Sequence, residues 1–223
     1  MGISEPGGAI MRHDSTGRVD ANPKWIRGYR DGKLIVDSRS TRLVWEHRYY
    51  PFWYIPTADI ADETVIAAGR QDPEGRAELE SCVRLEWSAM DSWFEEDVEV
   101  FVHPRSPEIR VDVLPTSRHI KISLDGVTLA ESDRARILYE TGLLPRYYLP
   151  KTDVRLDLLT PTDLQTVCPY KGWASYWNVT VGDTIHSDLV WGYATTLPES
   201  RDIAGLLCFY NEKVDIEVDG VLT

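Results

Sequence analysis

The sequence predicts a mainly β protein made of two tandem antiparallel-sheet domains with few short helices. The first observation is an internal repeat: residues 31–60 and 125–154 align without a gap, so that Glu46 matches Glu140, and nine of the thirty positions are identical. The second is a series of short apolar or β-branched segments separated by polar turn residues, a pattern typical of strands. A repeat that keeps its register this long indicates duplication of one structural unit.

The strands can be assigned in chain order. Residues 33–37 and 41–45 are predicted as the first strands of copy one, and residues 127–131 and 134–139 are their counterparts in copy two. A YIP or YLP segment follows each pair, and its prolines should mark strand ends or sheet edges because proline cannot donate a ladder hydrogen bond. Further strands are expected at residues 119–123 and 175–181, a short helix at 73–80 and a helical turn at 163–167.

The ends of the copies suggest a second match. Residues 98–102 resemble 206–210, and residues 109–114 resemble 216–222. With this match the chain divides into a flexible leader at 1–22, a degenerate first repeat at 23–115 and a second repeat at 116–223. The first repeat lacks any counterpart of the segment from Cys168 to Gly172. We therefore expect specific binding or chemistry mainly in the second repeat.

Composition excludes several functions. A net charge of −12 disfavours binding to nucleic acid, where affinity comes from Lys and Arg on phosphates, and to anionic membrane surfaces. No segment approaches the length of a membrane span, and no signal peptide is recognisable. Three cysteines without a C-x-x-C pair indicate neither a disulfide framework nor a zinc site. We expect a cytoplasmic protein with no metal and no cofactor.

Three motifs of the second repeat carry a family resemblance. They are E-x(4)-P-x-x-Y-x-P-x-x-D from Glu140 to Asp153, C-P-x-K-G-x-A-x-Y-W from Cys168 to Trp177, and W-x-Y from Trp191. They resemble the bacterial domain-of-unknown-function family 427, and the first copy resembles it without the C-P-x-K-G motif. The resemblance implies a β-tent-like domain in which two antiparallel sheets lean together. It implies no activity.

Cys168 and Lys171 are the candidate catalytic residues. An ammonium group near a thiol lowers the thiol pKa and yields a better nucleophile. The alternative is that Cys168 is a buried packing residue, as free cysteines usually are, and that Lys171 is a solvated turn lysine. His186 and Asp188 could in principle complete a Cys-His-Asp set, but D-T-I-H-S-D also fits an ordinary polar turn, which is the preferred interpretation.

A small-molecule site in the second repeat is the favoured function. Polar anchors and aromatic walls would hold a small polar or aromatic ligand of unknown identity. The same aromatic residues could instead be core, and Glu46 and Glu140 could instead form structural pairs with Arg42 and Arg136. The candidate ligand-binding residues are Glu140, Arg146, Tyr148, Lys171, Tyr176, Trp177, Trp191 and Tyr193.

Two other classes of function stay open. One is a thiol-dependent enzyme that uses Cys168 as nucleophile, activated by Lys171 or His186. The other is a protein–protein adaptor, which an exposed Trp173 would favour. Asp59 and Asp153, which recur after the prolines, are expected to close turns by accepting hydrogen bonds from local backbone N–H groups. The sequence does not indicate the oligomeric state.

Overall fold

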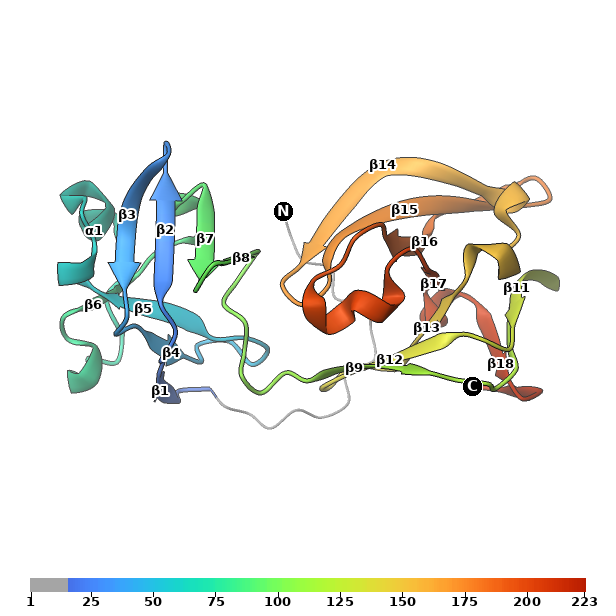
Figure 1. Ribbon diagram of the computed structural model, residues 1–223, viewed down its shortest axis with the longest axis horizontal. Coiled ribbons are helices and arrows are strands. Elements are labelled where there is room, and N and C mark those ends of the chain that lie inside the picture. The colour runs from blue at the N-terminus through green and yellow to red at the C-terminus, as the bar shows by residue number, and fades with distance from the viewer. Residues whose placement is uncertain (1–15) are drawn as a thin grey trace. The chain divides into compact units, whose positions relative to one another are not determined.

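The computed structural model describes residues 16–223 and divides them into two compact units, with the boundary between Pro107 and Glu108. Each unit contains one copy of the repeat and two antiparallel sheets (Figure 1). The prediction of a mainly β protein with two tandem domains is therefore confirmed. The units are called the first and the second repeat below.

The first repeat consists of two four-stranded sheets with strand orders β1-β4-β5-β6 and β3-β2-β7-β8. One α-helix and three 3-10 helices connect the strands. The elements are β1 (Val19–Ala21), β2 (Ile26–Arg30), β3 (Lys33–Ser38), β4 (Arg42–Val44), β5 (Phe52–Pro56), η1 (Thr57–Asp59), α1 (Glu63–Ala68), η2 (Ala77–Leu79), β6 (Cys82–Arg84), η3 (Trp87–Ala89), β7 (Ser92–Glu95) and β8 (Val98–Val100).

The second repeat has a seven-stranded sheet, β14-β15-β16-β17-β13-β12-β9, and a four-stranded sheet, β11-β10-β18-β19. The strands β14, β15 and β16 have ten residues each and form two long hairpins (Figure 1). The elements are β9 (Val111–Pro115), β10 (Ile120–Leu124), β11 (Val127–Ser132), β12 (Arg136–Glu140), β13 (Arg146–Leu149), η4 (Lys151–Asp153), η5 (Leu156–Leu158), β14 (Leu159–Cys168), β15 (Gly172–Val181), β16 (Thr184–Tyr193), η6 (Pro198–Ile203), β17 (Leu207–Phe209), η7 (Asn211–Lys213), β18 (Asp215–Val218) and β19 (Val221–Leu222).

The repeated Asp-Gly pair forms the same hairpin turn in both units. Asp31 and Gly32 connect β2 to β3 with φ values of 51° and 70°, and Asp125 and Gly126 connect β10 to β11 with 50° and 78°. Two consecutive positive φ values define a type I′ turn, whose twist matches that of the flanking strands. Gly adopts this conformation without steric cost, and Asp tolerates it better than most residues.

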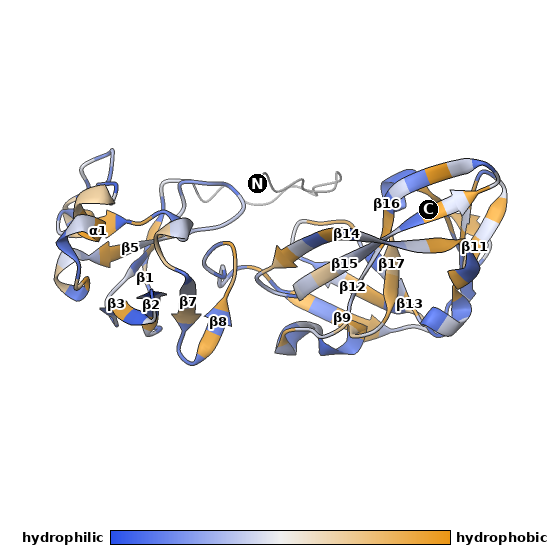
Figure 2. Cartoon of the chain, turned by 90° about the horizontal axis from the view of Figure 1, so that it is seen from above, coloured by the Kyte–Doolittle hydropathy of each residue, from blue (hydrophilic) through white to orange (hydrophobic). Residues whose placement is uncertain are grey.

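Alternation along the strands gives each repeat a core between its two sheets. In the second repeat this core contains Ile122 of β10, Phe209 of β17 and Val179 of β15, all at most 1% exposed. In the first repeat Ile26 and Trp53 belong to the equivalent core. Apolar and polar residues alternate along several strands of both units (Figure 2), as expected when successive side chains point to opposite faces.

The predicted domain limits are wrong at both ends of the first repeat. Residues 1–15 of the expected leader lie outside the described residues, but Val19–Ala21 form strand β1, which pairs with β4. Likewise β9, at residues 111–115, was expected to end the first repeat and instead pairs with β12 in the second. Each strand is held by main-chain hydrogen bonds to its own repeat, so the boundary lies before residue 108.

The predicted match between the ends of the copies is also wrong. Ile55 of β5 pairs with Val83 of β6, and its counterpart Leu149 of β13 pairs with Leu207 of β17. Strand β17 therefore corresponds to β6 and not to residues 98–102. Between these strands the first repeat has α1 and η2, whereas the second has the three long strands β14, β15 and β16.

The helices are few and short, as predicted, but their positions differ. Residues 163–167 belong to strand β14, and only Ala77–Leu79 of the expected helix at 73–80 is helical. The α-helix Glu63–Ala68 was not predicted, although Asp62 caps it by accepting a 2.8 Å hydrogen bond from the Thr64 backbone N–H. Within residues 16–223, every helix is too short or too polar to cross a membrane.

Candidate functional site

The predicted aromatic residues of the second repeat gather on one face of the seven-stranded sheet. Tyr176 of β15 lies opposite Trp191 of β16, Trp191 lies opposite Cys208 of β17, and Cys208 lies opposite Tyr148 of β13. Residues that are opposite in adjacent strands point to the same side of a sheet. These residues, with Tyr193, form one buried cluster on the face that points away from the other sheet. We call this surface the aromatic face.

The aromatic face is closely packed. Tyr148 is 1% exposed, and Tyr176, Trp191 and Tyr193 are all buried. The Trp191 indole N–H donates a 3.2 Å hydrogen bond to the Tyr148 hydroxyl, and their rings meet edge to face. Burial raises the pKa of Tyr148 well above its ordinary value. These side chains therefore pack together as one buried layer on the sheet.

Trp177 does not belong to the aromatic face, contrary to the prediction. It follows Tyr176 in β15 and so points to the opposite side of the sheet, where it packs against the core between the two sheets. The Lys151 ammonium lies 5.8 Å from its ring centroid. Trp177 is therefore a packing residue, separated from the other predicted wall residues by the sheet itself.

Arg146 is anchored to the aromatic face by an ion pair. Its two terminal nitrogens each donate a 2.9 Å hydrogen bond to the carboxylate of Glu212 in η7, and its guanidinium lies 5.6 Å from the Trp191 ring centroid. The Arg146 side chain is 10% exposed. A bidentate pair of this kind fixes the planar guanidinium in position, so Arg146 stabilises the face and has little freedom to bind a ligand.

Lys171 and Glu140 form a second buried ion pair at the edge of the face. The Lys171 ammonium donates a hydrogen bond to Glu140 Oε2, and the two side chains are 13% and 8% exposed. Burial alone lowers the pKa of Lys171, but its electrostatic interactions with Cys168 and Glu140 outweigh that effect and raise it. Lys171 is therefore cationic, and the predicted solvated turn lysine is wrong.

The first repeat contains an equivalent pair with different partners. Glu46, the counterpart of Glu140, accepts hydrogen bonds from the Arg84 guanidinium and from the Tyr54 hydroxyl. The predicted partners, Arg42 and Arg136, are wrong in both repeats. They stand at strand positions opposite Tyr54 and Tyr148, while the cations that pair with the two glutamates come from segments 31 and 38 residues away.

Cys168 lies beside this ion pair at the end of the β14–β15 hairpin. It is partly exposed, whereas Cys82 and Cys208 are buried. It interacts electrostatically with Lys171 and with Tyr193. The motif from Cys168 to Gly172 thus brings one partly exposed cysteine and one buried ammonium to the rim of the aromatic face.

The segment around η6 covers the hairpin end (Figure 1). The Leu197 backbone N–H donates a 3.3 Å hydrogen bond to the Lys171 carbonyl, and the Ser200 hydroxyl donates a 3.2 Å bond to the Tyr170 carbonyl. Gly172 has a φ of +96°, a conformation that L side chains rarely adopt. A depression of about 330 Å³ lies outside this cover and is lined by Val113, Pro198, Glu199, Arg201 and Asp202.

Comparison with family models identifies the repeats. The model described as a domain of unknown function (DUF427) matches residues 18–92 and 112–220. The chain belongs to the DUF427 family. A search of curated proteins finds no match. The two matched segments correspond to the two structural units, so this protein contains the DUF427 domain twice.

The Cys-His-Asp set, the less favoured alternative, does not form in the second DUF427 domain. The preferred interpretation, a polar turn, is also wrong, because His186 and Asp188 belong to strand β16. His186 lies near the far end of β16 and approaches Asp125 at 3.5 Å. Asp188 accepts a 2.7 Å hydrogen bond from the Thr162 hydroxyl, and its backbone N–H donates to the Asn178 side chain. Asp188 is held by residues of strands β14 and β15, whereas His186 faces the β10–β11 turn. Neither is placed beside Cys168.

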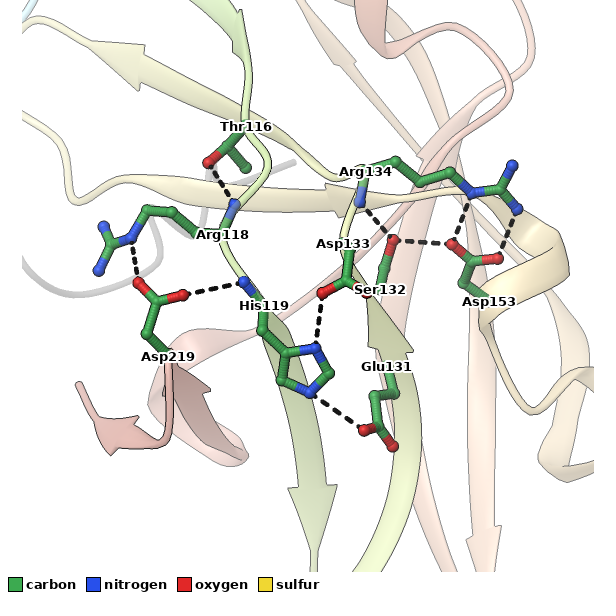
Figure 3. Close-up of polar contacts among 9 residues, drawn as sticks. All are labelled: Thr116, Arg118, His119, Glu131, Ser132, Asp133, Arg134, Asp153 and Asp219. Carbon is green, nitrogen blue, oxygen red and sulfur yellow. Dashed lines mark hydrogen bonds and ion pairs between the residues drawn. The ribbon is translucent and has the colours of Figure 1, made fainter.

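The repeated aspartates bind serine side chains and do not close turns in the predicted way. Asp153 accepts a 2.7 Å hydrogen bond from the Ser132 hydroxyl and a bidentate pair from Arg134 (Figure 3). Asp59 accepts a 2.6 Å bond from the Ser38 hydroxyl in the first DUF427 domain. The hydrogen bonds from Arg134 and Ser132 lower the pKa of Asp153 far below its ordinary value. In both domains this contact joins the second strand of the hairpin to the YIP or YLP segment.

Several residues around the aromatic face carry no signal in the sequence. Glu212, the partner of Arg146, lies 66 residues later in the chain. Tyr210 packs on Trp191 with ring centroids 4.6 Å apart, and the Thr166 and Tyr176 hydroxyls are 2.8 Å apart. Trp191 and Tyr193 of the W-x-Y motif lie on one face, because residues two apart in a strand point the same way.

Proposed function

We propose that the second DUF427 domain binds a small polar or aromatic molecule at the rim of its aromatic face. The observation that supports this most is the Lys171–Glu140 ion pair, buried beside aromatic rings and next to the partly exposed Cys168. Replacing a buried ion pair by apolar residues is often neutral or stabilising. A pair kept in such a place is therefore better explained by recognition than by stability.

The pair has unused hydrogen-bonding capacity. Among the described residues, Lys171 makes one side-chain hydrogen bond, to Glu140, although an ammonium has three donors. A ligand with an acceptor could bond to Lys171 while its apolar part rests on Tyr176 or Tyr193. The η6 segment, held to the hairpin end by two hydrogen bonds, would cover such a ligand.

Thermal unfolding with a fragment library tests this proposal. A fragment that binds this site should raise the melting temperature of the wild type and of Cys168→Ser, and it should have no effect on Lys171→Met. The matched control is Lys151→Met, which removes an exposed lysine of the same domain. A fragment that stabilises Lys171→Met as much as the wild type would place the binding elsewhere.

A thiol enzyme is the second candidate, because Cys168 alone among the three cysteines is partly exposed. Its weakness is that His186, the proposed base, faces Asp125. The rate of iodoacetamide labelling at Cys168 against pH distinguishes the two functions. Rapid labelling near neutral pH, lost in Lys171→Met, would favour the enzyme. Labelling only on unfolding would exclude it.

An adaptor function has one supporting observation. Trp173 of β15 is 54% exposed, as an interaction surface would require. Sedimentation velocity of the wild type and of Trp173→Ser tests whether this residue mediates association between copies of the chain. Concentration-dependent association that Trp173→Ser abolishes would support it, and monomers in both cases would remove self-association as its role.

We propose the location of the protein from its thiols and the class of its ligand from its net charge. The buried or partly buried thiols, none of them in a disulfide, are consistent with a cytoplasmic protein. The charge of −12 favours a ligand other than nucleic acid.

A further inference from the structure

A cavity in the first DUF427 domain is distinct from the proposed site. It measures about 220 Å³ and lies at strands β5 and β6, between helix η3 and the segment after β8. Five of its twelve lining residues are Trp, Tyr or Phe. Its lining comprises Tyr50, Phe52, Trp53, Ile55, Arg84, Leu85, Glu86, Trp87, Trp93, Val102, His103 and Pro104.

Three tryptophans form one side of the cavity. The ring centroids of Trp53, Trp87 and Trp93 are 5.5 to 5.7 Å apart. The Trp93 indole N–H donates a 2.9 Å hydrogen bond to the Trp87 carbonyl, which fixes both rings. On another side Tyr50 stacks on His103, with centroids 4.1 Å apart and planes at 12°. These flat apolar walls suit a planar ligand.

Two buried donors of the lining lack an acceptor. The Trp53 indole N–H is buried and makes no hydrogen bond within residues 16–223. The residue as a whole is 4% exposed, so solvent does not supply a partner. The Arg84 Nε–H is also buried and makes no hydrogen bond within these residues. The carbon atom Cζ of its guanidinium lies 3.6 Å from the Phe52 ring centroid. Buried polar groups without partners are rare in folded proteins because each one costs free energy. Arg84 lies opposite Tyr54, the residue after Trp53, so the Arg84 and Trp53 side chains point to opposite faces of the sheet. A ligand oxygen in the cavity would satisfy the Trp53 donor alone.

The charges near the cavity disfavour an anion. Arg84 already pairs with Glu46, and the Glu86 carboxylate lies 3.5 Å from the same guanidinium. The single positive charge is therefore more than balanced by two carboxylates, so the acceptor is better an uncharged carbonyl than a carboxylate. An apolar cavity of roughly 150 Å³ holds benzene, so the volume here corresponds to one ring or two fused rings.

We propose that the first DUF427 domain binds a planar, uncharged one- or two-ring heterocycle whose carbonyl accepts a hydrogen bond from the Trp53 indole N–H. The second domain lacks this site, because Tyr147 stands at the position of Trp53 and strand β16 pairs along β17. The inference is thus independent of the function proposed for the second domain.

The probe for this site is 2-quinolone, a neutral bicyclic lactam. In a two-dimensional NMR spectrum of the full chain, we expect 2-quinolone to shift the indole N–H resonance of Trp53 downfield. Naphthalene has the same ring area without the acceptor, and quinoline-2-carboxylate carries a charge. Both should bind at least about tenfold more weakly, which corresponds to the loss of one hydrogen bond or to charge repulsion.

The test variant is Trp53→Phe, which keeps an aromatic ring and removes the donor. It should weaken 2-quinolone binding by about tenfold, measured by titration calorimetry. The matched control, Trp177→Phe in the second domain, should bind as the wild type does. If Trp53→Phe fails to fold, the assigned Trp53 resonance in the wild type decides the question.

Three results would overturn the inference. They are the absence of any shift at Trp53 with about 1 mM 2-quinolone, equal affinity for naphthalene, and unchanged affinity in Trp53→Phe. Lys171→Met should leave 2-quinolone binding unchanged, so that failure of this site and failure of the site in the second domain can be told apart.

Discussion

At the scale of single residues, the two DUF427 domains stabilise the carboxylate of an equivalent glutamate with different partners. Glu46 has an arginine and a tyrosine hydroxyl, whereas Glu140 has Lys171 alone among the described residues. A tyrosine donor adds a second hydrogen bond without a second charge. The pair in the second domain is therefore the simpler one to dissect by mutation.

Lys171→Met should destabilise the protein by about 3 kcal/mol, because it leaves the Glu140 carboxylate buried without a partner. The double variant Lys171→Met/Glu140→Leu should recover most of this loss, since no charge is then buried. Urea unfolding of the wild type and both variants measures the difference. A double variant as unstable as Lys171→Met would show that the loss arises from packing.

His119 makes stability depend on pH. Its imidazole contacts Asp133 at 2.7 Å and Glu131 at 3.0 Å, and its backbone N–H donates to Asp219, which also pairs with Arg118 (Figure 3). The hydrogen bond with Asp133 is the main cause that raises the pKa of His119 above its ordinary value. A raised pKa in the folded state means that folding favours the protonated form.

The stabilisation by His119 should therefore be complete below its unfolded-state pKa of about 6.5 and should disappear as pH rises through the higher folded-state value. His119→Asn should lower the melting temperature at about pH 5.5 and have little effect at about pH 9. Differential scanning calorimetry at both pH values measures this. Glu131→Gln/Asp133→Asn should remove the same pH dependence, and an equal effect of His119→Asn at both pH values would contradict the mechanism.

At the scale of elements, close contact between strands restricts β16. A Cβ atom at Gly192 would lie 2.6 Å from the Leu206 carbonyl oxygen, which belongs to the backbone and cannot move aside cheaply. Gly192→Ala should cost about 1 to 3 kcal/mol, the usual range for overpacking a buried site. Ser187→Ala, at an exposed position of the same strand, is the control in chemical denaturation. Equal stability of the two variants would show that the strands can separate locally.

The residues that recur in both copies have structural roles at this scale. Asp31-Gly32 and its counterpart form the type I′ turns of the first hairpins, and the serine–aspartate contact joins each hairpin to the next extended segment. These recurring residues therefore belong to the structure that the two DUF427 domains share. Lys171 and Trp53, which are proposed to bind ligands, lie where the copies differ, whereas Glu140, the partner of Lys171, recurs as Glu46.

At the scale of the whole molecule, each DUF427 domain has its own core. The buried clusters of the first domain contain residues 26–100, and those of the second contain residues 120–218. Residues 16–107 and 108–223, expressed separately, should each fold and unfold cooperatively, because no core residue is removed from either. Circular dichroism and thermal melts check this, and a fragment without a cooperative transition would show that the domains depend on each other.

The sequence by itself determined the duplication, the β class and the strands whose residues alternate. Trp191 and Tyr193 were also candidate residues from the sequence, but their place on one face depends on strand β16, which the sequence did not predict. The pairing of strands required the tertiary structure: β9 looks like the end of the first copy but bonds to β12. The same holds for the partners of Glu46 and Glu140, and for the cavity of the first domain. These features join residues tens of positions apart, and no local pattern records which distant segment becomes the neighbour.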